Sequence, residues 1–193
     1  ITLDSMRYMI PQDSYYSRDA IIKEILCLQL ADGGFSFYQD VADADITAMA
    51  LQALAPYYNS EQVYRYTQQA TGKETIKTVR QVVDEALETL SSLQTAKGDF
   101  KSWDTENAES TAQVLVALTA LGIDSLTDTR FIKNGKNILD GLYQYKMNDG
   151  GFIHAKKYNP ENPTSLPDES NSMASEQVLV ALSSLYRYQT GYR

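Results

Sequence analysis

The 193-residue sequence contains few of the residues on which several classes of protein depend. It has one cysteine, Cys27, and therefore forms no internal disulfide. It has one histidine, His154, which excludes any site that needs two imidazoles and disfavours most zinc sites and hydrolytic triads. It also lacks a run of about 18 apolar residues, so no segment is expected to span a bilayer.

Basic residues are scarce as well. Seventeen Lys and Arg stand against 25 Asp and Glu, which gives a formal net charge of −8. No segment gathers its basic residues into a stripe that would neutralise phosphates, so neither nucleic acid nor an anionic membrane is expected as a partner. The hydrophobic fraction of 43% is ordinary for a globular protein. Because the chain begins ITLD and shows no signal-peptide pattern, we expect a piece of a longer protein.

One short string of residues recurs along the chain. QVLVAL occurs at Gln113–Leu118 and again, 64 positions later, at Gln177–Leu182. A related string, MALQAL at Met49–Leu54, lies a further 64 positions upstream. Three occurrences at one period predict an internal repeat. Within a single domain over residues 1–193, the three units are expected at about 17–58, 78–124 and 131–188.

A glycine turn followed by phenylalanine precedes each of these strings. The turns are Asp32-Gly33-Gly34-Phe35, Lys97-Gly98-Asp99-Phe100 and Asp149-Gly150-Gly151-Phe152. The first two turns are 65 positions apart and the last two only 52. The missing spacing reappears after the third turn as KKYNPENPTSLPDES, whose Pro, Asn and Ser content predicts an exposed loop.

Each unit is predicted to run helix, glycine turn, helix. The first helices have one apolar face and are expected at about 17–30, 78–95 and 131–146. The second helices are rich in Ala, Leu, Val and Met all round and are expected at about 45–56, 107–121 and 171–188. Helices that are apolar on every side need cover on every side, so they predict an inner layer enclosed by the first helices. Two flanking segments are expected to be helical in part, 2–10 and 59–76.

Helix-capping residue types agree with these positions. Ser17 precedes the first outer helix and Thr78 or Lys77 the second, and a hydroxyl at such a position can accept a hydrogen bond from a free backbone amide. The inner helices are expected to open on residues that satisfy or complement the free amides of a helix start: Asp45, Glu109 and the Asn171-Ser172 pair.

The glycine turns share a motif with a structural explanation. Gln-x-x-x-Gly-x-Phe occurs as Gln29, Gly33 and Phe35 and again as Gln94, Gly98 and Phe100, while the third unit keeps Gly150 and Phe152 but has Lys146 in place of glutamine. The glutamine amide is suited to bond the turn backbone, glycine to adopt a positive φ, and the ring to pack over the joint. Trp103 is interpreted as a further packing wedge.

This motif resembles the repeat shared by squalene and oxidosqualene cyclases and protein prenyltransferases. The resemblance covers about residues 17–188 and implies an all-α fold, a partial α/α toroid of three helix-turn-helix repeats where the family has six pairs. The strings ADITAMALQAL and TENAESTAQVLVALTALGID are most similar to prenyltransferase-like domains of bacterial surface proteins. Those domains are similar in turn to the helical domain of transcobalamin and intrinsic factor.

An acidic motif resembles the DxDDTA signature of cyclases that protonate an alkene. It reads Asp43-Ala44-Asp45-Ile46-Thr47, and the resemblance implies Asp45 as the proton donor. The third aspartate of the signature is replaced by Ile46, and residues 45–54, 109–121 and 173–185 contain no aromatic ring to stabilise a carbocation. The alternative is that Asp43 and Asp45 cap a helix and line a polar rim.

The prenyltransferase resemblance implies a zinc held by an aspartate, a cysteine two residues later and a distant histidine. The corresponding pairs are Asp45 with Thr47 and Glu109 with Thr111, so the thiolate is missing. Cys27 is predicted to be a buried thiol in an outer helix, and His154 a turn or surface residue. We therefore expect no catalytic residue and no metal.

A ring of helices brings the starts of its inner helices to one mouth. Polar residues concentrate there, and the candidate ligand-binding residues are Asp43, Asp45, Thr47, Asn107, Glu109, Thr111, Gln113, Ser175, Glu176 and Gln177. Because the hydroxyls of Thr47, Thr111 and Ser175 recur at the 64-residue period, they suit either backbone hydrogen bonding or ligand contact.

These patterns favour a non-catalytic, extracellular binding or adhesion module of a bacterial surface protein. Its partner would be a protein, a glycan or a small polar ligand. One alternative is the cobalamin-binding helical domain of a transcobalamin-like protein, with cobalamin as the ligand. Another is a terpene cyclase-like enzyme with a degenerate acidic motif.

Overall fold

A computed structural model describes residues 2–5, 8–38, 40–163 and 165–192 of the chain, which is mostly helical with two small antiparallel sheets. The α-helices are α1 (Thr2–Ser5), α2 (Arg18–Cys27), α3 (Ala44–Leu54), α4 (Val79–Leu93), α5 (Ala108–Ala120), α6 (Ile138–Tyr143) and α7 (Ser172–Thr190). Short 3₁₀ turns follow at Ala55–Tyr57 and Thr129–Phe131. The strands are β1 (Val63–Thr67), β2 (Glu74–Thr78), β3 (Phe100–Ser102) and β4 (Thr105–Asn107).

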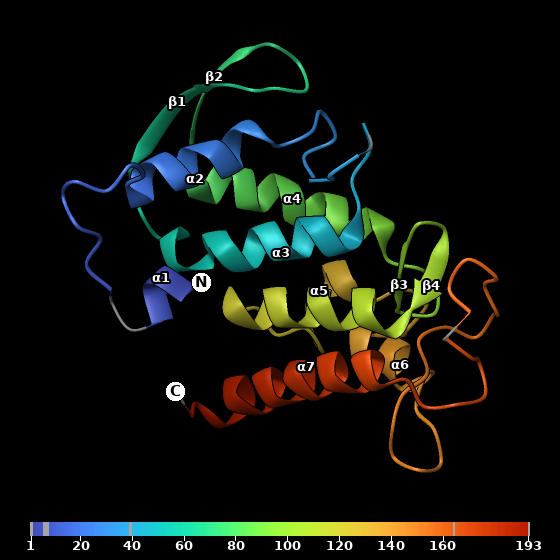
Figure 1. Cartoon of the computed structure of the whole chain (residues 1–193). Coiled ribbons are helices and arrows are strands. Elements are labelled where there is room, and N and C mark those ends of the chain that lie inside the picture. Colours follow the sequence, from blue (N-terminus) through green and yellow to red (C-terminus); the bar gives the residue numbers. More distant parts are fainter. Residues whose placement is uncertain (1, 6–7, 39, 164, 193) are drawn as a thin grey trace.

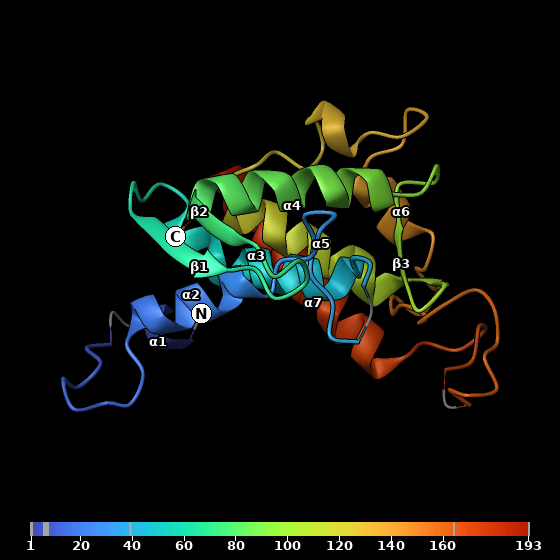
Figure 2. The same cartoon turned by 90° about the horizontal axis from the view of Figure 1, so that it is seen from above.

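Helices α3, α5 and α7 lie side by side and begin at the same end of the molecule (Figure 1). Small residues such as Ala48 and Ala112 are buried along these helices, which allows their backbones to approach closely. Helix α4 packs on α3, and α6 packs on α5 (Figure 2). The core contains fully buried leucines from the two layers, among them Leu51, Leu87 and Leu115.

The three helices of this row each begin within one position of the expected start, directly after a capping residue. Asp43, Asn107 and Asn171 each have an extended backbone and accept a hydrogen bond from the amide three residues later. Asp45 and Glu109 lie in the first turns of α3 and α5, as the sequence indicates, and there their acidic side chains complement the helix dipole. Among the outer helices, Ser17 and Thr78 cap α2 and α4 as predicted.

The third outer helix is much shorter than the predicted 131–146. It comprises only α6, preceded by a tight turn at Asn134 and Gly135 with φ values of 50° and 73°. Asn137 then starts α6 with a capping box to Asp140. The apolar spacing of this segment concealed the Asn-Gly turn, which is a stronger local signal than the helical period.

The segment 59–76 contains most of a β-hairpin and no helical turn, so the expectation of a helical part is wrong here. Strand β1 alternates exposed and buried residues, and Tyr64 and Tyr66 are the buried pair. It pairs with β2 through a turn in which Gly72 has a positive φ. In the segment 2–10, α1 is helical, residues 8–10 are not, and positions 6 and 7 lie outside the described residues.

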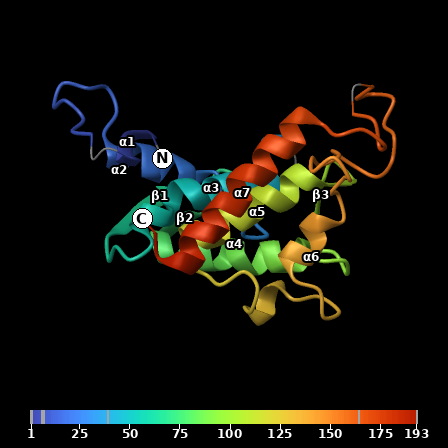
Figure 3. The same cartoon turned by 90° about the horizontal axis from the view of Figure 1, so that it is seen from below.

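Helix α7 is not covered on every side, contrary to the expectation for the inner helices. Leu179 is 65% exposed and Val180 53% exposed, whereas Ala181 in the same turn is fully buried. Helix α7 is the last of its row and packs mainly on α5, so one apolar face stays open to solvent (Figure 3). Among the described residues, no helix combines the length and the apolarity that are needed to cross a bilayer.

The glutamine motif holds the glycine turns as the sequence indicates. Gln29 Nε2 donates to the carbonyl of Gly33 at 2.9 Å, and Gln94 Nε2 donates to the carbonyl of Gly98 at 3.0 Å. Gly33, Gly98 and Gly150 all have a φ near +90°, a conformation that favours glycine. The phenylalanines of the three turns, Phe35, Phe100 and Phe152, are buried. In the third turn, where Lys146 replaces glutamine, the backbone of Lys146 forms a bridge to Phe152.

Candidate ligand-binding site

A cavity of about 740 Å³ lies at the end of the molecule where α3, α5 and α7 begin. Three sets of residues enclose it: the first turns of these helices, the β3–β4 hairpin and the loop before α7. The lining residues are Asp45, Ile46, Met49, Ser102, Trp103, Thr105, Asn107, Glu109, Gln113, His154, Asn159, Glu161, Asn162, Ser165, Asn171, Met173 and Gln177. The volume lies within the range of small-molecule sites.

Glutamine side chains connect the three helices at the cavity. Gln52 Nε2 of α3 donates to Gln113 Oε1 of α5 at 2.9 Å, and Gln113 Nε2 donates to Gln177 Oε1 of α7 at 3.1 Å. The recurrence of glutamine at the 64-residue period therefore has a structural basis. Gln177 ends this series, and its own amide group lines the cavity with no donor bond to any described residue.

His154 and Glu109 form an ion pair on the cavity wall. His154 Nδ1 lies 2.9 Å from both carboxylate oxygens of Glu109, which is 9% exposed. The backbone of this segment is held in place because Ala108 N donates to the carbonyl of His154 at 3.0 Å. The hydrogen bond to Glu109 raises the pKa of His154, and the negative charge of Asp45 adds to that effect. His154 lies in a bend of the chain, in agreement with the prediction, and it also lines the cavity.

Asp45 carries a desolvated carboxyl group in the first turn of α3. Its Oδ1 atom is buried and makes no hydrogen bond within the part of the chain that the structure describes. Burial raises the pKa of Asp45 to about 6, and the charges of Asp43 and Glu109 also raise it, whereas the hydroxyls of Ser110 and Ser102 partly offset the increase. At pH 7 the group is mainly ionised and poorly compensated.

The cavity has an acidic lining. Asp45, Glu109 and Glu161 contribute carboxylates, His154 is the one basic side chain, and no described Lys or Arg lines the wall. Such a lining repels anionic ligands. Among the described residues, no three His, Cys, Asp or Glu side chains are grouped as ligands for a metal ion.

A smaller cavity of about 140 Å³ adjoins the first and shares four of its residues, Asp45, Ile46, Ser102 and Trp103. Its remaining lining residues are Ser36, Phe37, Tyr38 and Asp43. We call Phe37, Tyr38 and Trp103 the aromatic corner, since their rings gather here. The ring centroids of Phe37 and Tyr38 are 6.1 Å apart, and those of Tyr38 and Trp103 are 6.4 Å apart.

The β3–β4 hairpin explains why Trp103 faces solvent. Trp103 and Asp104 form its two-residue turn with φ values of 49° and 60°, the positive values of a tight hairpin turn. Trp103 is 69% exposed, so the interpretation as a packing wedge is wrong. Ser102 links the hairpin to α3, because its hydroxyl donates to Asp43 Oδ2 at 2.5 Å.

The ten predicted ligand-binding residues fall into two groups in the structure. The cavities are lined by Asp43, Asp45, Asn107, Glu109, Gln113 and Gln177. The other four, Thr47, Thr111, Ser175 and Glu176, do not line them.

The three recurring hydroxyls bond the backbone of the glycine turns instead. Thr47 Oγ1 accepts from the amide of Phe35 at 2.9 Å, Thr111 Oγ1 from Phe100 at 3.1 Å, and Ser175 Oγ from Phe152 at 2.9 Å. Each hydroxyl thus connects the start of α3, α5 or α7 to the glycine turn that precedes that helix. Glu176 is exposed on α7 away from the lining.

Sequence reasoning missed the residues that come from loops. The Pro- and Asn-rich insertion was expected only to be exposed, yet Asn159, Glu161 and Asn162 from it line the cavity. Its position gave a usable signal, because an insertion between a glycine turn and an inner helix must lie close to the start of that helix. Trp103 had a second signal: the only tryptophan of the chain lies in a polar, charged segment.

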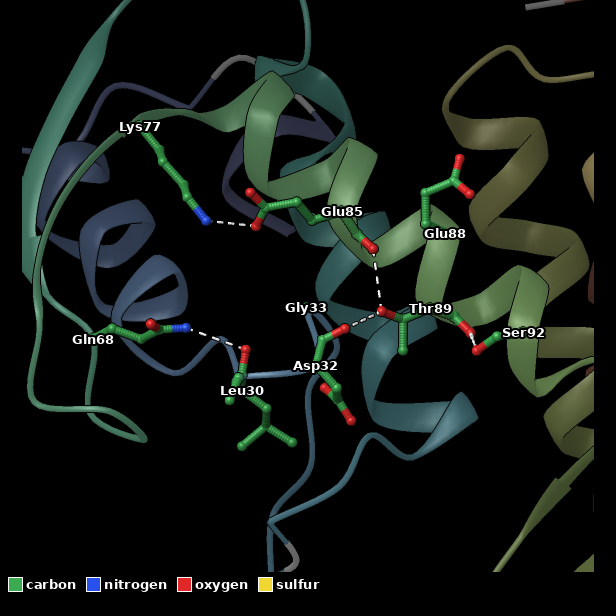
Figure 4. Close-up of a pocket in the computed structure, with 10 residues that line it drawn as sticks. Leu30, Asp32, Gly33, Gln68, Lys77, Glu85, Glu88, Thr89 and Ser92 are labelled. Atoms are coloured by element: carbon green, nitrogen blue, oxygen red, sulfur yellow. Dashed lines mark hydrogen bonds and ion pairs between the residues drawn. The ribbon is translucent and has the colours of Figure 1, made fainter.

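A separate cavity of about 540 Å³ lies between α4 and the loop that follows α2 (Figure 4). Its polar groups are largely engaged with one another. Lys77 Nζ contacts Glu85 at 2.5 Å, Thr89 Oγ1 donates to the carbonyl of Asp32 at 2.5 Å, and Gln68 Nε2 donates to the carbonyl of Leu30 at 3.1 Å. These contacts connect the hairpin, the glycine turn and α4, so they have a structural role.

Neither a scan against models of known protein families nor a search of curated proteins finds a match for this chain.

Proposed function

We propose that this chain is a non-catalytic binding module of a bacterial surface protein and that it holds a glycan in the 740 Å³ cavity. The observation that carries this proposal is the lining itself, in which amide and carboxylate groups from three helices and two loops converge on one space. The similarity of its inner-helix strings to prenyltransferase-like surface domains supports the extracellular location.

Free hydrogen-bonding groups in the cavity favour a hydroxyl-rich ligand. Among the described residues, no partner engages Gln177 Nε2, Asn159 Nδ2 or the second ring nitrogen of His154, while Asp45 and Glu161 contribute carboxylates. Sugar hydroxyls both donate and accept, so they match donors and acceptors placed side by side. Trp103, Met49 and Met173 add apolar surface for the faces of sugar rings.

The proposal includes the partial toroid, with α3, α5 and α7 as its inner helices. Its support is that hydroxyls at the 64-residue period make equivalent bonds to three glycine turns. The row has two open ends, and the exposed apolar face of α7 is one of them.

The alternatives gain less from the cavity. A cyclase needs an enclosed apolar chamber around its proton donor, whereas Asp45 lies among carboxylates, amides and hydroxyls. A raised pKa near 6 still leaves Asp45 ionised at neutral pH, which is unsuited to protonating an alkene. Cobalamin is tested beside glycans, because the case for it comes from the resemblance to the helical domain of transcobalamin and does not depend on which residues line the cavity.

The test uses an array of neutral and acidic oligosaccharides, followed by melting curves with those that bind and with cobalamin. We expect neutral glycans to bind and acidic ones not to. A ligand present at 100 times its Kd adds about 2.7 kcal/mol to the free energy of unfolding. Stabilisation by cobalamin alone, or a product formed from squalene or a prenyl diphosphate, would overturn the proposal.

Two neighbouring residues of α7 make a matched pair of variants. Gln177→Ala removes an amide from the lining, and we expect it to weaken glycan binding about five- to tenfold, as the loss of one hydrogen bond does. Glu176→Ala changes an exposed residue outside the lining and should bind as the wild type does. Equal loss in both variants would place the glycan elsewhere.

A further inference from the structure

We propose that the aromatic corner is a binding site for a trimethylammonium group, such as that of choline, carried by the ligand of the larger cavity. This inference rests on the proposed function and specifies one substituent of the ligand. The aromatic corner adjoins the larger cavity through Asp45, Ile46, Ser102 and Trp103, so one ligand can occupy both.

Three large aromatic side chains are exposed together at the corner. Phe37 is 72% exposed, Tyr38 82% and Trp103 69%. They come from two separate segments, the loop before α3 and the β3–β4 hairpin, which the hydrogen bond from Ser102 to Asp43 holds together. Aromatic faces attract cations that lie within about 6 Å of the ring centroid, and clusters of such rings recognise quaternary ammonium groups.

Carboxylates lie at the base of the same small cavity. Asp43 and Asp45 both line it, and no described lysine or arginine does. Asp45 Oδ1 is buried without a hydrogen bond among the described residues, so the protein compensates the charge of Asp45 only in part, through the Ser110 and Ser102 hydroxyls and His154. A cation held between the rings would supply the missing positive charge at short range.

The carboxylate oxygens at the aromatic corner favour a trimethylammonium group over a primary ammonium, because few of them are free to accept a hydrogen bond. A primary ammonium is strongly hydrated and requires hydrogen-bond acceptors to replace its water. Here three of the four carboxylate oxygens are engaged or buried: Asp43 Oδ1 accepts from the amide of Ile46, Asp43 Oδ2 accepts from Ser102, and Asp45 Oδ1 is out of reach of solvent. A trimethylammonium group donates no N–H bond and instead presents methyl groups to the rings.

The size of the small cavity agrees with this group. Its volume of about 140 Å³ is small beside the 740 Å³ of the larger cavity, so it suits one compact substituent rather than a whole ligand. The wall toward the larger cavity is shared, so the rest of the ligand has a path out of the corner.

The single tryptophan makes the test direct. Fluorescence of Trp103, excited selectively over tyrosine, is followed while choline chloride, methylammonium chloride or the uncharged choline analogue 3,3-dimethylbutan-1-ol is added at constant ionic strength. We expect a saturable change with choline and at least tenfold weaker responses to the other two. An equal response to the uncharged analogue, tighter binding of methylammonium, or no saturable response to choline would overturn the inference.

Calorimetry of two tyrosine variants locates the site. Tyr38→Ala should weaken choline binding at least tenfold, whereas Tyr15→Ala, which removes a ring that is 91% exposed in the N-terminal segment, should leave it unchanged. Equal effects of the two variants would contradict the assignment. If the protein binds a neutral glycan through Gln177 but does not bind choline, this inference alone is overturned. If it binds neither choline nor a glycan, the proposed function is overturned too.

Discussion

Asp45 combines two features that rarely occur together at a stable helix start. Its position in the first turn of α3 favours a negative charge, but the buried Oδ1 atom lacks a hydrogen bond among the described residues. Asp43, Glu109 and the paired His154 are its charged neighbours, so two carboxylates act against it and one imidazole acts for it. Such an uncompensated group destabilises the protein unless a ligand compensates it, which is typical of binding sites.

Asp45→Asn is therefore expected to stabilise the free protein at neutral pH. The pKa of Asp45 is raised from 3.8 to about 6 on folding, so the wild type loses stability as the pH rises from about 4 to about 6, and the asparagine variant does not. The difference above pH 6 should be on the order of 1–3 kcal/mol and should vanish below about pH 4. Urea unfolding at pH 3.5, 5 and 7.5 measures it. A variant that is less stable than the wild type at pH 7.5 would show that the carboxylate is satisfied.

His154 offers a second residue-level check, because it is the only histidine of the chain and gives one imidazole signal in NMR. Its pKa is raised above 6.5, chiefly by the hydrogen bond to Glu109. The stability from this pair is fully present below about pH 6.5 and is lost as the pH rises through the folded-state pKa. We expect Glu109→Gln to lower the titration midpoint of His154. Identical midpoints in the two proteins would mean that the ion pair does not form in solution.

At the scale of the elements, the repeat sets helix positions but not their burial. The two copies of QVLVAL place Leu115 and Leu179 at the same position of the motif. Leu115 on α5 is fully buried between neighbouring helices, whereas Leu179 on α7 is 65% exposed. Identical local sequence therefore has different energetic weight, because cover depends on the neighbouring helices.

These two leucines give a matched prediction. Leu115→Ala should lower the free energy of unfolding by about 2–5 kcal/mol, because it leaves a cavity in the core. Leu179→Ala should lower it by less than about 0.5 kcal/mol, as is usual for surface positions. Chemical denaturation of both variants measures the difference. Similar losses would mean that α7 is covered on its outer face in solution.

Much of the helical arrangement was predictable, and the remaining elements show what the sequence obscured. The apolar period and the caps at Ser17 and Thr78 located two outer helices. The β1–β2 hairpin was missed because the alternation of Tyr64 and Tyr66 with polar residues spans only one short strand. In the candidate site, residues on helices such as Glu109 were predicted because helix starts converge. Trp103 and Asn159 lie on loops, whose paths depend on tertiary contacts that a local pattern does not specify.

At the scale of the whole molecule, the groups that hold the glycine turns lie apart from the candidate site. Buried amides and hydroxyls such as those of Gln29, Gln94 and Thr47 hold the turns and make no part of the cavity wall. Both candidate cavities lie at the end of the molecule where α3, α5 and α7 begin (Figure 1). Some of their lining groups also hold the fold, because Asn107 and Asn171 cap α5 and α7 and Gln113 links α5 to α7.

The most direct test of this account is an NMR map of the protein titrated with a neutral oligosaccharide that binds on the array. We predict that the shifted signals belong to the cavity end, including the side-chain amide of Gln177 and the indole N–H of Trp103. Signals of Leu179 and Val180 on the open face of α7 should not move. Shifts confined to that face, or no shifts in the cavity, would contradict the central claim.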